Sequence, residues 1–350
     1  MHKKMYSGVE RVNAVYILKS MIRTGDVPMA SIRDVAKIAG VSPATVSRVM
    51  NGTANVDADK RQRVYEAIKQ TGFVPNEVAR SLFKKSAKLI GLIIPSITNP
   101  FFTELADAVE KTADESGFRV VYYNTDNNAD KEKMAVGMLK SMNADGIIIT
   151  SNNEELIDVI DKSGMSVVMI DRNMSPECNY PLITSDHYYG GRLAAQCLID
   201  SGCKNIVCIR GEQSISSARE RFLGFSDVCQ ENGLEVNYID CGHDFTHEGD
   251  IVTKIRKISP EADGIFACND MMALSVYKQL TQRGIKVPQD VSIVGFDDVM
   301  LSKLVTPAIT TISQPIDKMG RMAVKFITGE KISQKAVVYK PELIKRETTR

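Results

Sequence analysis

The chain lacks the long apolar run of a membrane protein and the cysteine pattern of a secreted or zinc-binding one. Its hydrophobic segments fall far short of the roughly 18 residues that a membrane-spanning helix needs. It has seven cysteines but no CxxC pair, and no secretory signal. We therefore expect a cytoplasmic protein without a membrane span, in which the cysteines are buried thiols: Cys178, Cys197, Cys203, Cys208, Cys229, Cys241 and Cys268.

The motifs of common enzymes are missing as well. No GxGxxG or GxxxxGK[ST] opens a predicted helix, so a nucleotide-phosphate cradle is not indicated. His243 and His247 have the i, i+4 spacing of metal ligands on a helix, but no third ligand accompanies them. No activated nucleophile stands out either, so we expect no enzyme, no metal site and no cofactor.

The net charge of +1 hides an asymmetry along the chain. Residues 29–88 carry eleven lysines and arginines against five aspartates and glutamates, whereas residues 89–350 carry 28 against 36. A small basic module on a large acidic body indicates that the module alone approaches a polyanion. At 350 residues, the chain is long enough for two or three domains. Residues 1–28 are either an appended helix or the result of a start assigned too early, with Met29 as the alternative start, and we assign them no function.

Residues 31–52 predict two short helices around a tight turn. Ser31 and Ser42 stand at helix N-cap positions, Gly40 stands at a left-handed C-cap, and Pro43 takes the first position of the second helix. A third helix is predicted over 57–72. The second helix has a low outer face that could enter a groove of DNA, made of Pro43, Ala44, Thr45, Ser47 and Arg48.

The stretch "IRDVAKIAGVSPATVSRVMNG" resembles the helix-turn-helix of the lac repressor family, and the likeness continues through "VPNEVARSLFKKSAKLIGLIIP". The resemblance implies that Pro43, Ala44 and Arg48 read bases and that Thr45 and Ser47 contact phosphates, next to Ser42 and Asn51. Arg48 is the strongest candidate for a base contact because its guanidinium can donate hydrogen bonds to both guanine O6 and N7. A phosphate contact is its alternative role.

Residues 76–88 resemble the hinge helix and linker of the same family. In a dimer, two such hinges pair in the minor groove, and each inserts a leucine between bases. Leu82 stands at that position, Ala79 would let the helices pack closely, and Asn76 lies at the start of the segment. A helix this short has no core of its own, so we expect it to form only on DNA.

From residue 89 onward, short apolar strands alternate with amphipathic helices, a pattern typical of an α/β fold with doubly wound parallel sheets. The predicted strands are "LIGLIIP", "RVVYYN", "GIIIT", "SVVMI", "NIVCIR", "GIFAC" and "VSIVGF". Ligands bind at the carboxyl ends of such strands. That rule selects residues 98–102, 150–153, 171–172, 268–270 and 295–298, which combine polar groups with phenylalanines, as a sugar site requires. The chain has no tryptophan to stack on a larger ring.

Residues 89–350 resemble the bilobal, periplasmic-binding-protein-like body of the lac repressor family, most closely its ribose repressor branch, in "SSARERFLGF", "ACNDMMALSVYKQLTQRGIKVPQDVSIVGFDD" and "TTISQPIDKMG". Thr150 departs from this likeness because ribose binders place an asparagine there, for which Asn152 or Asn153 could substitute. The resemblance implies a ligand site of Asn99, Phe101, Phe102, Asp171, Arg172, Arg221, Phe245, Asn269, Phe296, Asp297 and Gln314.

Several of these residues have a purely structural alternative. Asn269 and Asp270 precede a helix, and we expect Asp270 to cap it and Asn269 to bind the ligand. Either Phe101 or Phe102 could belong to the core. The adjacent Asp171 and Arg172 could be a mere ion pair.

Three classes of function follow: a ligand-controlled DNA-binding repressor, a secreted sugar receptor, or an enzyme. Residues 31–85 favour the repressor, which we expect to be a homodimer on palindromic operator DNA. A small sugar, D-ribose above others, would act as inducer by closing the lobes and melting the hinge. The sign of this coupling is open, because some relatives bind DNA only with a purine or a phosphoprotein partner.

Overall fold

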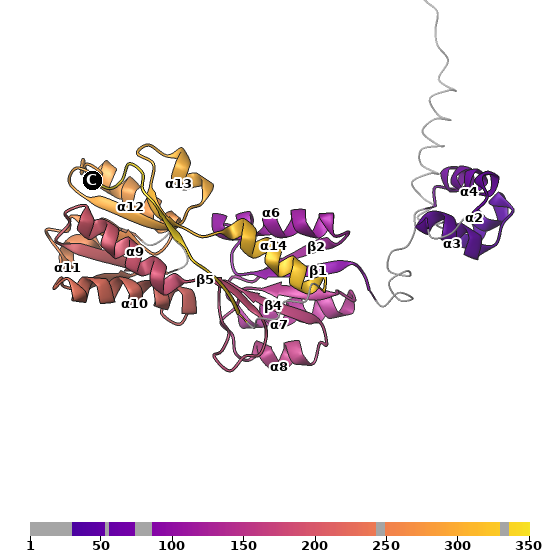
Figure 1. Ribbon diagram of the computed structural model, residues 1–350, viewed down its shortest axis with the longest axis horizontal. Helices are drawn as coiled ribbons and strands as arrows, with labels where there is room; N and C mark the ends of the chain where they lie inside the picture. The colour runs from indigo at the N-terminus through magenta and orange to yellow at the C-terminus, as the bar shows by residue number, and fades with distance from the viewer. Residues whose placement is uncertain (1–29, 53–55, 74–85, 243–248, 330–335) are drawn as a thin grey trace, which may run out of the picture. The chain divides into compact units, whose positions relative to one another are not determined.

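A computed structural model describes residues 30–52, 56–73, 86–242, 249–329 and 336–350 (Figure 1). The chain divides into a small unit within residues 1–80 and a large unit within residues 81–350. In the described residues, no helix is both long and apolar enough to cross a membrane.

The small unit contains the helices α2 (Ile32–Ala39), α3 (Pro43–Asn51) and α4 (Ala58–Thr71). The predicted caps are confirmed: Ser31 forms a capping box with Asp34, and Ser42 accepts a hydrogen bond from the backbone N–H of Thr45. Gly40 ends α2 at φ 63°, a left-handed conformation that favours glycine. The inner faces of the three helices form one small core of Val35, Ala36, Ala39, Val46, Val49, Val64 and Ala67.

The large unit consists of two lobes, each built on a six-stranded sheet. The first lobe contains β1 (Leu89–Ile94), α6 (Pro100–Glu115), β2 (Arg119–Asn124), α7 (Ala129–Ser141), β3 (Gly146–Ile149), α8 (Leu156–Asp161), β4 (Ser166–Ile170), β5 (Leu182–Ser185), α14 (Ile316–Ile327) and β11 (Ala336–Tyr339). Its strand order is β11-β5-β4-β3-β1-β2, and all of its strand pairs are parallel.

The second lobe has the strand order β12-β10-β9-β8-β6-β7. It contains α9 (His187–Asp200), β6 (Ile206–Arg210), α10 (Ser216–Glu231), β7 (Asn237–Asp240), α11 (Ile251–Ile258), β8 (Gly264–Ala267), α12 (Asp270–Gln282), β9 (Ser292–Asp297), α13 (Met300–Leu304), β10 (Thr310–Ser313) and β12 (Glu342–Ile344). The strand pairs are parallel except β10–β12, which is antiparallel, so the predicted parallel α/β fold is confirmed with one reversed edge strand.

Alternate residues of the first-lobe strands serve two separate cores, because successive side chains of a strand point to opposite faces. Ile148 and Val168 pack with α6 and α14, which lie next to each other (Figure 1), whereas Ile147 and Ile149 pack with α7 and α8. The chain crosses between the lobes after β5, after β10 and again before β12. These crossings bring the carboxyl ends of the two sheets toward each other.

All seven predicted strands are present within one or two residues of their expected ends, but the alternation missed β5, β7, β10, β11 and β12. The missed strands are three or four residues long, and β7 and β11 lie at sheet edges with most of their residues partly exposed. The same alternation predicts a helix over 247–258, of which the structure describes α11 from Ile251 onward, while residues 243–248 lie outside the described part.

Candidate functional site

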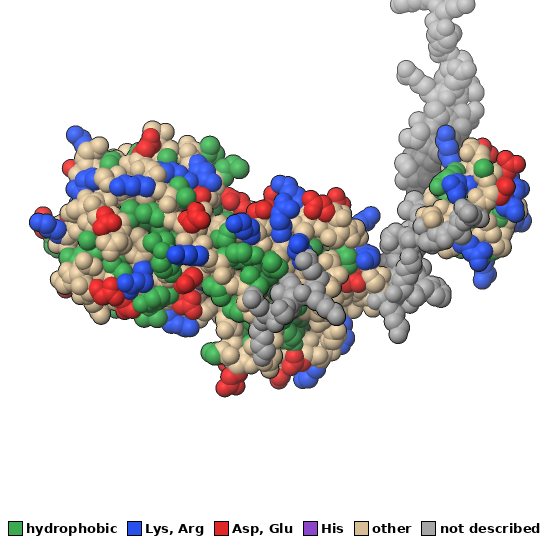
Figure 2. Space-filling model, in the orientation of Figure 1, with side chains coloured by type: hydrophobic (Ala, Val, Ile, Leu, Met, Phe, Trp, Pro, Cys, Tyr) green, Lys and Arg blue, Asp and Glu red, His purple; other side chains and the backbone are tan. Residues whose placement is uncertain are grey.

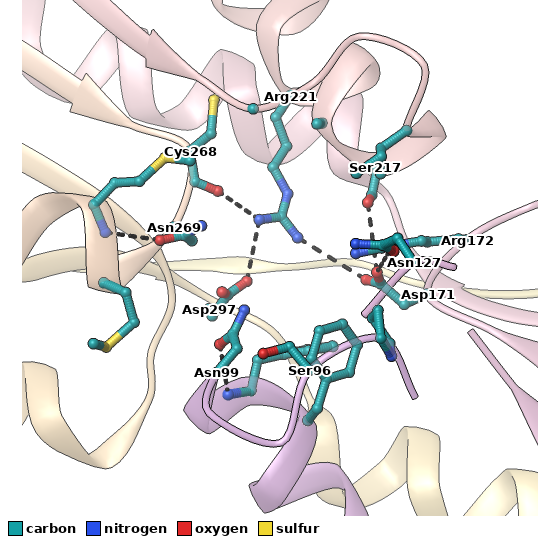
Figure 3. A pocket seen from close by; sticks show the side chains of 18 of the residues that line it. Ser96, Asn99, Asn127, Asp171, Arg172, Ser217, Arg221, Cys268, Asn269 and Asp297 are labelled. Atoms are coloured by element: carbon teal, nitrogen blue, oxygen red, sulfur yellow. Dashed lines mark hydrogen bonds and ion pairs between the residues drawn. The ribbon is translucent and has the colours of Figure 1, made fainter. Parts of the chain in front are cut away.

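A cavity of about 590 Å³ lies between the two lobes of the large unit. Its wall is built from the segments that follow β1, β2, β4, β6, β8 and β9, as the rule for the carboxyl ends of parallel strands predicts. Figure 3 shows charged side chains from both lobes converging on it. Eight of the predicted ligand residues line this cavity: Asn99, Phe101, Phe102, Asp171, Arg172, Arg221, Asn269 and Asp297.

The first turn of α6 forms an aromatic part of the wall. Asn99 caps the helix by accepting a hydrogen bond from the backbone N–H of Phe101 (3.1 Å). The rings of Phe101 and Phe102 meet edge to face with their centroids 5.1 Å apart. Both rings also belong to the core of the first lobe, so they are core residues and wall residues at once.

Asp171 and Arg172 directly follow β4 and line the cavity. The Arg172 Nε lies 3.7 Å from the Asp171 Oδ2, and Arg172 Nη1 donates to the Asn127 Oδ1 at 2.8 Å. They therefore do form an ion pair, but one that faces the cavity (Figure 3). Asp171 is held at φ 67°, a left-handed conformation that is strained for a residue with a side chain.

Arg221 of α10 stands opposite, on the second lobe. Its Nη1 donates to the main-chain oxygen of Cys268 at 2.6 Å and lies 3.2 Å from the Asp297 Oδ1. Its Nη2 lies 4.0 Å from the Asp171 Oδ1 of the first lobe. Its guanidinium carbon lies 3.8 Å from the centroid of the Phe296 ring, a cation–π contact. The guanidinium thus sits between one carboxylate from each lobe.

Two buried polar atoms of this wall have no hydrogen-bond partner among the described residues: Asp171 Oδ1 and Arg172 Nε. Buried polar groups are nearly always paired, so unpaired ones need an explanation. Both atoms belong to residues that line the cavity, where a polar ligand could supply the missing donor and acceptor.

Burial and nearby charges shift the pKa values of the Asp171 and Asp297 carboxyl groups. It works to raise the pKa of Asp171, but the facing His187, Arg221 and Arg172 together hold that pKa below its usual value. At Asp297 burial wins, and the nearby Asp171 charge adds to it, so the pKa rises to about 7 despite Arg221 and Gln314. Asp297 also has φ 106°, which strains its backbone.

Replacing Asp297 with asparagine is expected to be less costly, relative to the wild type, at alkaline pH than at acidic pH. A folded-state pKa above the unfolded value means that the free energy of unfolding falls as pH rises from about 4 to 7, and the cost persists above 7. Asparagine does not ionise, so the free energy of unfolding of Asp297→Asn relative to the wild type should be about 1–3 kcal/mol higher near pH 8 than near pH 4. Urea unfolding of both proteins at the two pH values measures this. An equal effect at both values would contradict the raised pKa.

The other predicted ligand residues do not line the cavity. Phe296 is fully buried beneath Arg221, and Gln314 donates to the Asp297 Oδ1 at 2.8 Å from behind the wall. Both therefore support wall residues: Phe296, in β9, packs against Arg221, and Gln314, just after β10, holds Asp297. Phe245 lies outside the described residues, as do His243 and His247.

One expectation about residues near the cavity was wrong, and a substitution that the sequence left open is not seen. Asn269, not Asp270, caps α12, by accepting from the backbone N–H of Met272 at 2.8 Å. Asp270 is buried and accepts from Thr311 and from the backbone of Val299. Neither Asn152 nor Asn153 takes the place of the asparagine missing at Thr150, because neither lines the cavity, and Thr150 itself is buried and donates to the Ile170 oxygen.

Sequence reasoning also missed residues that the structure brings to the site. Asn127 holds Arg172, and Ser217 Oγ of the second lobe donates to the Asp171 Oδ2 at 3.4 Å. His187, fully buried behind the wall, contacts both Asp171 and Arg221. No motif marked these residues; only "SSARERF" hinted at Ser217 by its place before Arg221.

The small unit carries the candidate DNA-binding residues. Pro43, Ala44 and Arg48 are exposed on α3, as is its cap Ser42, while Thr45 and Ser47 are half-buried. The visible face of this unit is rich in lysine and arginine side chains (Figure 2). The side chain of Asn51 and the residues Asn76, Ala79 and Leu82 lie outside the described part of the chain.

Comparison with known proteins independently supports the division into a DNA-binding part and a ligand-binding part. Residues 31–76 match the model of bacterial regulatory proteins of the lacI family, and residues 195–349 match a periplasmic binding protein-like domain. The chain is 38% identical to the ribose operon repressor of Halalkalibacterium halodurans, over 92% of this chain and 98% of that protein. It is 34% identical to the transcriptional repressor PurR of Pasteurella multocida, over 92% and 99% of the two chains.

Two solved structures are similar in fold. The lac repressor dimer bound to operator and the anti-inducer ONPF matches with a TM-score of 0.80 and 27% identity, over 91% of this chain and 99% of that one. A regulator from Alkaliphilus metalliredigens complexed with D-xylulofuranose matches with a TM-score of 0.69 and 33% identity, over 75% and 99%. Given its helix-turn-helix, its bilobal body and these identities, the chain belongs to the lacI family of bacterial regulatory proteins.

Proposed function

We propose that this protein is a transcriptional repressor that binds palindromic operator DNA as a homodimer and releases it when D-ribose enters the cavity between the lobes. The observation that carries the ligand assignment is the composition of the cavity wall. It combines the aromatic rings of Phe101 and Phe102 with carboxylates and guanidinium groups that come from both lobes. Rings of this kind cover the C–H face of a sugar, while the charged groups hydrogen-bond its hydroxyls.

Two observations favour a five-carbon sugar over a larger ligand: the ligands that the names of similar proteins mention, and the absence of tryptophan from the sequence. One relative is a ribose operon repressor, and another similar structure holds a pentulose in its furanose form. The unpaired Asp171 Oδ1 and Arg172 Nε supply one acceptor and one donor to such a ring. Asn99, Arg221, Asn269 and Asp297 would supply the rest.

A purine co-repressor is the second candidate, because the chain is also 34% identical to a PurR protein. The two candidates predict opposite effects on DNA binding. A co-repressor would strengthen operator binding, whereas an inducer would weaken it.

In the small unit, Pro43, Ala44 and Arg48 would read bases, and Ser42, Thr45, Ser47 and Asn51 would contact the backbone. Asn76, Ala79 and Leu82 would form the hinge that enters the minor groove, with Leu82 as the wedge. The exposure of Arg48 at the end of α3 supports its role, because its fork can form two bonds to one guanine.

The test uses the full-length protein. The protein first selects binding sites from a pool of random DNA sequences, and the selected sites should be palindromic. In a gel-shift titration, D-ribose is expected to weaken binding to that DNA about 5- to 150-fold, the usual range of such couplings. Arg48→Ala should lose about 1–3 kcal/mol of binding and relax the preference at one base pair of each half-site. Lys257→Ala, on α11 of the second lobe, serves as the control for loss of a single exposed positive charge.

Two outcomes would overturn parts of this proposal. DNA binding that requires hypoxanthine and ignores D-ribose would replace the inducer by a purine co-repressor. Failure to enrich any sequence would remove the operator function altogether.

A further inference from the structure

His187 is a buried histidine that no ligand can reach, yet it contacts both charged groups that face each other across the cavity. It is the first residue of α9, immediately after the chain crosses from the first lobe to the second. It is only 1% exposed and does not line the cavity. Its position at a crossing between the lobes is what lets one ring touch groups from both.

The two ring nitrogens of His187 have different partners. Arg221 Nε donates a hydrogen bond to the His187 Nδ1 at 3.2 Å. A guanidinium N–H can only donate, so Nδ1 must be the unprotonated nitrogen of the ring. The proton is then on Nε2, which donates to the Asp171 main-chain oxygen at 3.3 Å and lies 3.3 Å from the Asp171 Oδ1 without a hydrogen bond to it. The contacts therefore select one neutral tautomer.

This arrangement also fixes the direction of the Arg221 guanidinium. Of its three nitrogens, Nε is held by His187, and Nη1 is held by the Cys268 oxygen at 2.6 Å and by Asp297 at 3.2 Å. Nη2 remains, 4.0 Å from the Asp171 Oδ1, too far for a direct hydrogen bond (Figure 3). Because the guanidinium is planar, fixing Nε and Nη1 also fixes the direction in which Nη2 points.

We propose that His187 is a positioning residue that, as the neutral Nε2–H tautomer, holds Arg221 of the second lobe and Asp171 of the first lobe in the spacing that the ligand needs. This rests on the proposed function, since a ligand between the two groups is assumed. Arg221 then presents Nη2, and Asp171 presents Oδ1, to one ligand group between them. The residue acts through Arg221 and Asp171 and touches no ligand itself.

Three substitutions separate this role from mere packing. In His187→Asn, the side-chain oxygen takes the place of Nδ1 and can still accept from Arg221, but nothing reaches Asp171. In His187→Gln, the amide nitrogen takes the place of Nε2 and can still donate to Asp171, but Arg221 loses its acceptor. His187→Phe fills the space of the ring and loses both contacts.

Calorimetry with D-ribose should show affinity lowered about tenfold in His187→Asn and in His187→Gln, because each releases one of the two residues that face the ligand, and about 100-fold or more in His187→Phe, which releases both. Tyr188→Phe is the control on the same helix: it removes the surface contacts of the Tyr188 hydroxyl with Asp227 and Arg192 and should leave the affinity unchanged. A packing role predicts the opposite order, with the ring-filling phenylalanine tolerated best. That order would overturn the proposal.

A second measurement does not depend on any ligand. Nitrogen NMR of the full-length protein labelled at its histidines, with His187→Phe used to assign the signal, should show an unprotonated Nδ1 and a protonated Nε2 at neutral pH. A ring protonated on Nδ1, alone or together with Nε2, would overturn the proposal. If wild-type protein shows this tautomer but does not bind D-ribose, the pentose assignment fails and the positioning role of His187 stands.

Discussion

Arg221→Met is expected to lower the free energy of unfolding by about 3–5 kcal/mol near pH 8 and to abolish D-ribose binding. The reason is that Arg221 is 7% exposed and is the cation shared by the carboxylates of Asp297 and Asp171. Removing one partner of a buried pair leaves an uncompensated charge in the interior, which costs far more than the pair itself contributes. Methionine has a similar length, so lost volume adds little to this loss.

The loss in the free energy of unfolding caused by Arg221→Met should be smaller at lower pH. The pKa of Asp297 is already raised to about 7 by burial, and without Arg221 the carboxyl is held even less in its charged form. Near pH 5 it can take up a proton and escape the penalty, so wild type and variant should differ less there than at pH 8. Chemical unfolding followed at both pH values gives the two differences.

Arg192→Met is a matched control on α9, the helix that packs against α10. Arg192 donates two hydrogen bonds to Glu231, at 2.9 and 2.7 Å, but both side chains are substantially exposed. An exposed pair of this kind contributes about 0–1 kcal/mol, even with bidentate geometry. If Arg221→Met costs no more than Arg192→Met, the buried network does not have the role that its geometry indicates. The double variant Arg221→Met with Asp297→Asn should recover part of the loss, because it removes one of the two stranded charges.

The sequence predicts the frame of the site because the frame depends on local patterns. Apolar runs such as "LIGLIIP" predict the central strands, and the carboxyl-end rule then places Asp171, Asn269 and Asp297 at one opening. Helix α14 was missed although its signal is present: its buried residues recur at helical spacing. The edge strand β7 has a single buried residue, Ile239, so no periodicity marks it.

What the sequence does not predict is which side chains stand behind the wall. Phe296 and Asp297 are neighbours in β9, and strand alternation sends one into the lobe and the other to the cavity, but the sequence does not show which face is which. His187 and Asn127 reach the charged groups only through tertiary contacts with residues 16 to 45 positions away. Asp270 and Asn269 are equally good caps on propensity, and the buried contacts of Asp270 decide between them.

Gly191→Ala should be among the most damaging single-methyl additions in the chain, lowering the free energy of unfolding by about 2–4 kcal/mol. Helices α9 and α10 cross with their backbones in contact at two glycines. A Cβ on Gly191 would lie 2.0 Å from the main-chain oxygen of Arg221, and a Cβ on Gly224 would lie 2.0 Å from that of Tyr188. Backbone atoms cannot rotate away, so the helices have to separate.

The separation would also disturb the site, because α9 begins at His187 and α10 carries Arg221. We therefore expect D-ribose affinity to fall together with stability in Gly191→Ala. Gly137→Ala on α7 is the matched control: it is a helical glycine with no atom near its added Cβ, so the better helix propensity of alanine should stabilise the protein by about 0.5–1 kcal/mol. Thermal unfolding and calorimetry of the two variants test both halves. A Gly191→Ala protein as stable as Gly137→Ala would show that the two helices are not held at this distance, and the fixed geometry of Arg221 and His187 would lose its structural basis.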